Sequence, residues 1–344
     1  MCKFYFNSVI LAFFIVTSVT GQGIVESPLF QTLEPLALKV SGSVKYTKGN
    51  SNDSTYITNQ VFFQHTDGRQ DSIQYKAKVR GNFRLKKCYF PPLKIKLKSK
   101  EVEDTPFAAN KNLKLVLPCQ NTSDKNRLIL KEYLCYRFYE LITPFYFKTR
   151  LTAIALTETS KKKPRSYELL GFFVEDNQKV AERNGGKVMK ELKLHPKYFD
   201  DLNTIRHDFF QFMIGNVDWS SSFQHNSNIL KLPPAKYVPL AYDFDMAGFV
   251  NAAYARENAP AMSNGDIKSR IYRGYCREKS LMKSVREEYI KLEPSIFSLL
   301  DNYKEEFPKS EFSEMRQYLE QFFKILNNDT AFENQILNSC RTDQ

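Results

Sequence analysis

Residues 113–142, LKLVLPCQNTSDKNRLILKEYLCYRFYELI, contain the change of pattern on which the fold depends. Residues 113–117 place apolar side chains with the period of two that is typical of a half-buried strand. From residue 125 to residue 142 the apolar side chains recur with the helical period, and Thr143 and Pro144 stop the pattern. The stretch therefore predicts a strand followed by one long helix.

The residues around this stretch predict a β-rich region. Short runs with period-two character precede the helix, separated by turn-like segments. These runs are residues 36–40, 61–63, 73–79 and 93–97, with turns at 48–54 and 65–68. Two further strands, at 150–156 and 169–174, follow the helix.

The C-terminal half has a different pattern. It predicts a helix over 202–214, short strands at 228–232 and 237–242, and an almost wholly helical segment after Ser269. We expect an α+β protein with a β-rich N-lobe (22–176) containing one long helix, and a mostly helical C-lobe (177–344). This is the layout of a two-lobed, kinase-like fold.

Composition places the chain among ordinary globular proteins. It has 344 residues, of which 42% are hydrophobic and 26% charged, with 13 Gly and 15 Pro, so it is neither disordered nor collagen-like. The net charge of +12 is spread along the chain and accompanies no nucleic-acid recognition motif. We therefore expect no specific nucleic-acid partner.

The N-terminal segment predicts export. Residues 1–21 combine the positive Lys3, the apolar run VILAFFIV at 9–16 and small residues at 19–21, which is the pattern of a signal peptide. The apolar run is too short to span a membrane, which takes about 20 residues, and no later run is long enough. We expect a periplasmic or extracellular protein without a membrane span, beginning near Gln22.

Five cysteines follow this segment. They are Cys88, Cys119, Cys135, Cys276 and Cys340. Thiols in an oxidising compartment tend to pair, but an odd number leaves at least one free or paired between chains. Cys88 and Cys119 lie at the ends of two strand-like runs and could form a disulfide. The spacings do not resemble zinc sites, and the oligomeric state stays open.

Three short motifs in the C-terminal half carry the candidate chemistry. Asp218, in the sequence NVDW, follows a helix and lies on a loop where a catalytic carboxylate can reach substrate. Asn228 precedes a strand and offers a neutral oxygen to a hard cation such as Mg²⁺. Asp243 ends an apolar strand, with Asp245 two residues later. Each could be an ordinary turn or capping residue, but their order favours a catalytic site.

These motifs resemble those of the CotH-type spore-coat kinases and, more distantly, HipA-like and other atypical kinases. The N-terminal half adds RGNFR at 80–84, PPLKIKL at 91–97, LKEYLCYR at 130–137 and LGFFVED at 170–176. The similar stretches run from about residue 78 to residue 248. The resemblance implies a kinase that uses ATP and Mg²⁺ to phosphorylate a protein or cell-surface substrate.

The resemblance also implies roles for individual residues. Asp218 would be the catalytic acid, and Asn228 and Asp243 would hold Mg²⁺. The residues implied to bind ATP or to support its binding are Lys96, Lys94, Glu132, Arg80 and Glu175. Lys96 would be the phosphate lysine with Lys94 second, because both point to the strand face opposite Leu93, Ile95 and Leu97. Glu132 would pair with that lysine, Glu175 would lie near the hinge, and Arg80 could touch phosphate.

Two features depart from the family pattern. Ten residues separate Asp218 from Asn228, about twice the family's usual spacing, so residues 220–224 must loop out and Asn226 competes for the ligand role. No glycine-rich G-x-G-x-x-G phosphate loop is present.

Three functions remain open from the sequence. The first is an exported, CotH-like kinase. The second is a non-catalytic secreted binding or assembly protein with a kinase-like fold. The third is a hydrolase that uses Asp243 and Asp245 as paired carboxylates, which requires both to lie on one face.

Overall fold

The computed structural model describes residues 26–52, 54–65, 67–159, 164–190, 193–256 and 266–342, without the side chains of Asn82 and Phe83. The predicted signal peptide, residues 1–21, lies outside the described residues.

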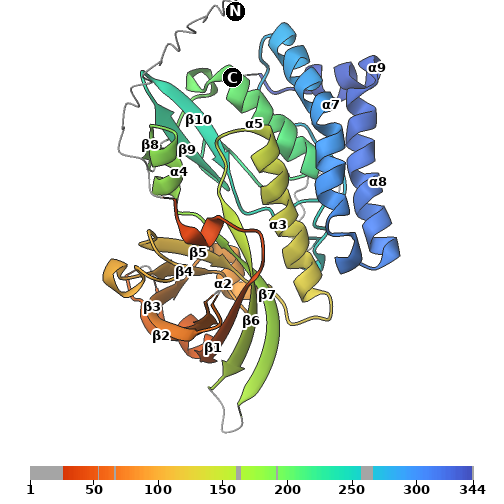
Figure 1. Ribbon diagram of the computed structural model, residues 1–344. Helices are drawn as coiled ribbons and strands as arrows, with labels where there is room; N and C mark the ends of the chain where they lie inside the picture. The colour runs from red at the N-terminus through yellow and green to blue at the C-terminus, as the bar shows by residue number, and fades with distance from the viewer. Residues whose placement is uncertain are drawn as a thin grey trace, which may run out of the picture.

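Seven strands close into a barrel (Figure 1). They are β1 (Leu36–Gly42), β2 (Ile57–Gln64), β3 (Gln70–Val79), β4 (Leu93–Lys96), β5 (Asn112–Val116), β6 (Thr149–Glu158) and β7 (Arg165–Val174). Their order around the barrel is β1-β2-β3-β4-β5-β7-β6. The barrel closes where β1 pairs in parallel with β6, so that Leu38 lies opposite Ile154, while the other pairs are antiparallel.

Apolar side chains from alternate positions of the strands fill the interior of this barrel. On β3, Ile73, Tyr75 and Ala77 are buried, while Gln74 and Lys76 between them are exposed. The inward side chains of all seven strands belong to one apolar cluster, because a period of two sends every second residue to the same face. The outward residues of β3, β4 and β5 remain available for other contacts.

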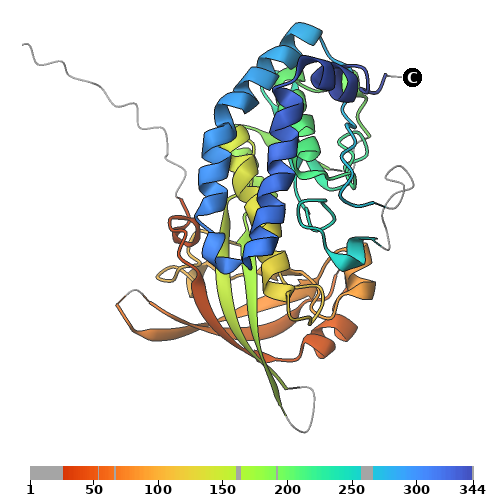
Figure 2. The same ribbon diagram turned by 90° about the vertical axis from the view of Figure 1, so that its right-hand side faces the viewer.

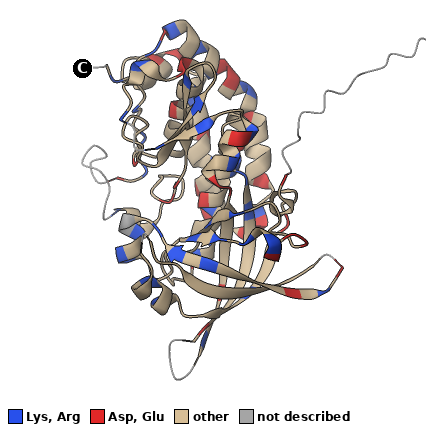
Figure 3. Ribbon diagram, turned by 90° about the vertical axis from the view of Figure 1, so that its left-hand side faces the viewer, with Lys and Arg blue, Asp and Glu red and all other residues tan. Residues whose placement is uncertain are grey.

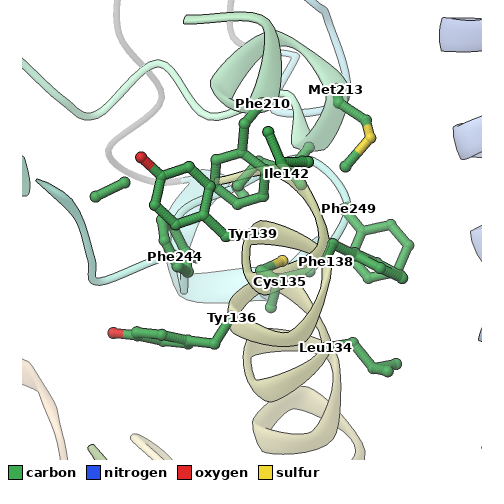
Figure 4. Packing of buried hydrophobic residues seen from close by; sticks show 14 of the residues in the cluster. Leu134, Cys135, Tyr136, Phe138, Tyr139, Ile142, Phe210, Met213, Phe244 and Phe249 are labelled. Carbon is green, nitrogen blue, oxygen red and sulfur yellow. The ribbon is translucent and has the colours of Figure 1, made fainter. Parts of the chain in front are cut away.

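A second core lies among the long helices, which stand beside one another above the barrel (Figure 2). They are α3 (Lys125–Ile142), α5 (Asp201–Ile214), α7 (Lys279–Asp301) and α8 (Lys309–Leu326). Although α3 comes between β5 and β6 in the chain, Tyr139 on α3 packs on Phe210 of α5 with ring centroids 4.5 Å apart (Figure 4). Tyr136 of α3 likewise contacts Phe244, at 4.6 Å, so α3 supports the loop that follows the small sheet.

Shorter elements complete the fold. A small antiparallel sheet consists of β8 (Lys187–Met189), β9 (Ser227–Leu232) and β10 (Lys236–Ala241). The short helices are α1 (Val44–Asn50), α2 (Asn82–Lys87), α4 (Asn177–Arg183), α6 (Ala253–Arg256) and α9 (Asp329–Phe332). Figure 1 shows the small sheet and α4 to the left of the long helices, with α4 just above β5 of the barrel.

The expected strands and long helices are confirmed, but the expected fold class is wrong. We predicted a two-lobed kinase-like fold with a β-rich N-lobe and a mostly helical C-lobe, whereas the strands form a closed, mixed barrel. The error has a physical cause. Period-two patterns say which side chains share a face, but the pairing of β1 with β6, far apart in sequence, depends on strand tilt and register.

Two disulfides stabilise the chain. Cys88 pairs with Cys119, and Cys276 pairs with Cys340. Cys135 is the free cysteine of the described residues and is buried. Disulfides are typical of proteins that fold in an oxidising compartment, which agrees with the expected export. Across the described helices, none combines the length and the apolar character needed to cross a bilayer.

Candidate functional site

Three carboxylates gather around one arginine between the barrel and the helical part. Arg84, from α2, places Nη2 3.0 Å from Oε1 of Glu132, 2.9 Å from Oδ1 of Asp243 and 2.6 Å from Oδ1 of Asp245. Ligand atoms of the three acids lie within 4.8 Å of one another, a spacing that could also hold a metal ion. In this structure the single positive charge of Arg84 is shared among the three acids.

Burial and the neighbouring charges give the three acids different pKa values. Burial raises the pKa of Glu132 to about 8, and burial also raises the pKa of Asp245 above its usual range. Burial acts in the same direction on Asp243, but Arg84, Arg80, Lys114 and His225 together lower the pKa of Asp243 below its usual range. Asp243 is therefore the acid of the three that stays ionised most readily.

The backbone holds Asp243 in an uncommon conformation. Its φ of 66° lies in the left-handed region, which costs energy for a residue with a side chain. The hydroxyl of Tyr136 on α3 accepts a hydrogen bond from the Asp243 N–H at 3.0 Å. β10 ends at Ala241, yet Asp243 and Asp245 both reach Arg84, so the turn brings the two carboxylates together without a continuing strand.

A row of lysines crosses the outer face of the barrel opposite these acids. Lys78 on β3 lies opposite Lys94 on β4, and Lys94 lies opposite Lys114 on β5. All three side chains are half-buried. Figure 3 shows Lys and Arg as blue bands on neighbouring strands of the barrel next to the helical part. Like charges directly opposite each other destabilise a sheet, so this row lowers the stability of the folded protein when no anion is bound.

Lys114 lies where the barrel meets the loop of Asp243. Its ammonium donates a hydrogen bond to Oδ1 of Asn177 at 2.5 Å and lies 5.1 Å from the ring centroid of Tyr242. Arg80 approaches the same ring, with its guanidinium carbon 5.9 Å from the centroid. Burial first, and then the nearby Arg80 guanidinium, lower the pKa of Lys114 to about 7. Arg80, Lys94 and Lys114 thus form a basic group beside Asp243.

Asp218, the predicted catalytic acid, is held on both carboxylate oxygens. Nε2 of His225 lies 2.7 Å from Oδ1, and Nδ2 of Asn226 donates to Oδ2 at 3.0 Å. The Asp218 N–H donates to Oδ1 of Asn216 at 3.0 Å, so its backbone is fixed as well. Such an oriented, partly exposed carboxylate suits a group that must accept a hydrogen bond from a substrate hydroxyl.

Two asparagines compete for the role of metal ligand. The Asn226 carbonyl accepts a hydrogen bond from the Tyr242 N–H at 3.1 Å, which places Asn226 beside Asp243 across the β9–β10 pair. Asn228 lies opposite Leu240 within the sheet, and its buried Nδ2 has no hydrogen-bond partner in the described part of the chain. Mg²⁺ is usually held by one or two carboxylates together with substrate phosphates. Asp243 with an amide oxygen of Asn226 or Asn228 fits that donor set.

The other predicted residues lie elsewhere. Lys96 belongs to the exposed row beside Lys76, and its ammonium lies 4.3 Å from the ring centroid of Tyr56. Glu132 pairs with Arg84 and not with Lys94 or Lys96, because α3 turns it toward α2. Glu175 follows β7, accepts a hydrogen bond from the Lys148 N–H and pairs with Arg183. It ties the barrel to α4 and does not reach the lysine row.

Sequence reasoning missed three residues of this site. Arg84 closes the RGNFR motif, of which we assigned Arg80 alone. Lys114 stands in LKLVL with the alternation that singled out Lys94 and Lys96, and its neighbour across the sheet is Lys94. His225 directly precedes Asn226 and lies three residues before Asn228. The repetition of Lys between apolar residues was the available signal for Lys114.

Comparison with known proteins adds no family. No protein-family model matches the chain, and no curated protein matches it. The resemblance to CotH-type kinases therefore rests on the short motifs alone.

Proposed function

We propose that this protein is an exported phosphotransferase. In this proposal it binds ATP with Mg²⁺ between the outer face of β3–β5 and the loops that carry Asp218 and Asp243. The γ-phosphoryl group then passes to a hydroxyl of a protein or cell-surface substrate in the periplasm or outside the cell.

The observation that carries the proposal is the half-buried lysine row beside an ionised carboxylate. Lys94 and Lys114 oppose each other across β4 and β5, and Lys114 also lies near Arg80. A folded protein keeps such repulsion where a ligand relieves it, and a lysine with a shifted pKa beside a carboxylate, such as Lys114, is typical of a binding site. A triphosphate would supply the missing negative charge.

Each group of side chains has a role in this chemistry. Arg80, Lys94 and Lys114 would bind the phosphate oxygens and stabilise the charge that develops during transfer. Asp218, oriented by His225 and Asn226, would align the acceptor hydroxyl and accept its proton. Asp243 with Asn226 or Asn228 would hold Mg²⁺, which neutralises phosphate charge when bound.

Calorimetric titration with ATP, with and without Mg²⁺, tests this proposal. We compare the wild type with Lys114→Met and with the matched control Lys76→Met, since Lys76 lies on the same outward face of the barrel but is exposed. We expect Mg²⁺-dependent binding that weakens at least tenfold in Lys114→Met and stays within twofold in Lys76→Met. Equal affinity in all three proteins would reject the site.

One observation favours a second candidate function. Oδ1 of Asp243, the expected metal ligand, already contacts the Arg84 guanidinium at 2.9 Å. A non-catalytic binding protein could use the basic group for an anion without any metal. It would bind ATP equally well with and without Mg²⁺ and would release no ADP, whereas the phosphotransferase would require Mg²⁺ and lose turnover in Asp218→Asn.

A further inference from the structure

The segment that looks like an insertion in the sequence forms a tight loop attached to Asp218. The Ser220 N–H donates to the His225 carbonyl at 2.8 Å, and the His225 N–H donates back to the Ser220 carbonyl at 2.9 Å. Residues 221–224 therefore form a loop that is closed at its base, with Ser221 and Ser222 buried. The base carries His225 on Asp218, while the tip exposes 64% of Phe223. The loop is thus rigidly connected to the proposed catalytic acid.

This loop forms one wall of a large hollow. The hollow has a volume of about 890 Å³, within the range of about 300–1,000 Å³ for small-molecule sites. The polar, charged and aromatic side chains in its lining include those of Lys193, His195, Ser222, Phe223, Tyr275 and Arg341. The Leu194 N–H donates to the Ser222 carbonyl at 3.1 Å, so the loop and the segment before α5 are joined at the base of the hollow.

Two cation–aromatic pairs lie in its lining. The ammonium of Lys193 is 4.8 Å from the ring centroid of Phe223, and the guanidinium carbon of Arg341 is 4.2 Å from that of Tyr275. Arg341 is fixed at the backbone, because its N–H donates to the Gly274 carbonyl and its carbonyl accepts from the Cys276 N–H, both at 2.9 Å. The Cys276–Cys340 disulfide lies next to this pairing. The positive charge is therefore presented in a preorganised position.

The charge of the hollow has one sign. Among its lining residues in the described ranges none is acidic, while Lys193 and Arg341 are basic. Only 6% of Ser222 is exposed, and its buried hydroxyl has no hydrogen-bond partner among the residues that the structure describes. Buried polar groups are normally paired, so Ser222 adds an unpaired polar group, but no charge, to this wall of the hollow.

The hollow is connected to Asp218 through the loop, because Ser222 and Phe223 line the hollow and His225 at the base of the same loop contacts Asp218. The charges of both Arg341 and Asp218 act on the partly buried Arg273: besides burial, Arg341 lowers the pKa of Arg273 and Asp218 raises it. The Arg273 guanidinium also donates to the Val217 carbonyl, one residue before Asp218. A chain bound in the hollow would therefore lie next to the carboxylate that receives the acceptor hydroxyl.

We infer that the hollow binds an acidic polypeptide segment that flanks the acceptor hydroxyl, an inference that rests on the proposed phosphotransferase function. Glutamate or aspartate side chains would pair with Lys193 and Arg341, while their methylene groups and neighbouring apolar residues pack on Phe223 and Tyr275. A nucleic acid is a poorer fit, because it needs a stripe of cations along its backbone and the described lining of the hollow offers only two, Lys193 and Arg341.

Fluorescence anisotropy without nucleotide tests this inference separately from catalysis. The probe is a labelled 15-residue peptide of Glu, Ser and Tyr, compared with the same peptide carrying Gln for Glu. We expect the Glu peptide to bind and the Gln peptide to bind at least tenfold more weakly. The double variant Lys193→Gln/Arg341→Gln should lose at least tenfold in affinity for the Glu peptide, and Lys283→Gln, an exposed lysine on α7, should stay within twofold.

Several outcomes would overturn the inference. Equal binding of both peptides, or an unchanged affinity in the double variant, would exclude the hollow as an acidic-segment site. A single-stranded oligonucleotide of equal charge that binds more tightly, and loses this binding in the double variant, would assign the hollow to nucleic acid. Peptide binding with these dependences, in a protein that fails to bind ATP, would preserve the inference and reject the proposed function.

Discussion

Lys114 is the residue at which stability and function oppose each other. Its ammonium is partly removed from water and lies close to Arg80 and Lys94, which is why its pKa falls to about 7. Below that pH the buried charge destabilises the folded state. The penalty is relieved as the pH rises from about 7 toward the ordinary lysine value of 10.5, because the folded state then gives up a proton that the unfolded state keeps.

We predict that Lys114→Met stabilises the protein by about 1 kcal/mol at pH 6 and by less at pH 9, since methionine removes the charge and keeps the stem. Chemical denaturation at both pH values measures this. Lys76→Met, an exposed change on the same face, should stay within about 0.5 kcal/mol of the wild type. A destabilised Lys114→Met protein would mean that Lys114 is a structural residue.

Glu132 makes the stability of the folded state depend on pH with the opposite sign. Burial raises its pKa to about 8, so the folded state holds a proton that the unfolded state loses above its ordinary value of 4.5. Stability from this group is therefore complete below about pH 4.5 and declines as the pH rises toward 8.

Glu132→Gln imitates the protonated acid and should flatten this decline between pH 5 and 8. One proton contributes up to about 1.4 kcal/mol per pH unit. Urea unfolding of both proteins at half-unit intervals provides the comparison. Parallel pH profiles would show that Glu132 is ionised in the folded state throughout this range.

At the residue scale, the sequence predicted part of the site. Asp218 and Asp243 were recognisable because they follow a helix and a strand, where backbone geometry fixes a side chain. Arg84 was not, because its importance comes from Glu132 and Asp243, which are distant in sequence and are brought near only by folding. The alternation of Lys114 with apolar residues was a signal for its outward face, but its pairing with Lys94 is known only from the fold.

At the scale of elements, Gly171 is a position where two strands of the barrel approach too closely for a side chain. It lies on β7, between β5 and β6, where a Cβ atom would meet the Val116 carbonyl oxygen at 2.8 Å. Backbone cannot move aside as a flexible side chain can. Gly49 on α1 is the matched contrast, because a Cβ atom there would meet nothing within 4 Å.

We predict that Gly171→Ala lowers the free energy of unfolding by about 2 kcal/mol, in the range of overpacked core positions. Gly49→Ala should be neutral or raise it by up to about 1 kcal/mol, since alanine favours a helix. Thermal unfolding of the two variants decides the point. Equal stability of both would mean that β7 can shift away from Val116 at little cost.

The elements themselves were easier to predict than their arrangement. The periodicity of residues 125–142 marked the whole of α3, and alternating runs marked every barrel strand. Nothing local in β1 specifies that Leu38 should lie opposite both Phe63 and Ile154, because that choice depends on closing the sheet.

At the scale of the whole molecule, the Cys276–Cys340 disulfide connects the segment before α7 with the end of the chain, across 64 residues. It also lies beside Arg341 in the proposed acidic-segment site. We predict that Cys276→Ala/Cys340→Ala lowers the free energy of unfolding by about 2–4 kcal/mol. Denaturation with and without reducing agent measures this. Under reducing conditions, which also open Cys88–Cys119 in both proteins, the wild type and the variant should have the same stability. An unchanged stability would show that the backbone pairing of Tyr275 and Arg341 suffices.

The central claim is that the barrel and the helical part together form one phosphate site, with Arg80, Lys94 and Lys114 on one side and Asp243 and Asp218 on the other. A crystal structure of the protein saturated with Mg²⁺ and a non-hydrolysable ATP analogue tests this most directly. We predict a triphosphate within hydrogen-bond distance of Lys114 Nζ and the Arg80 guanidinium, with the γ-phosphate facing Asp218. A nucleotide bound at any other surface, with the lysine row in contact with solvent alone, would contradict it.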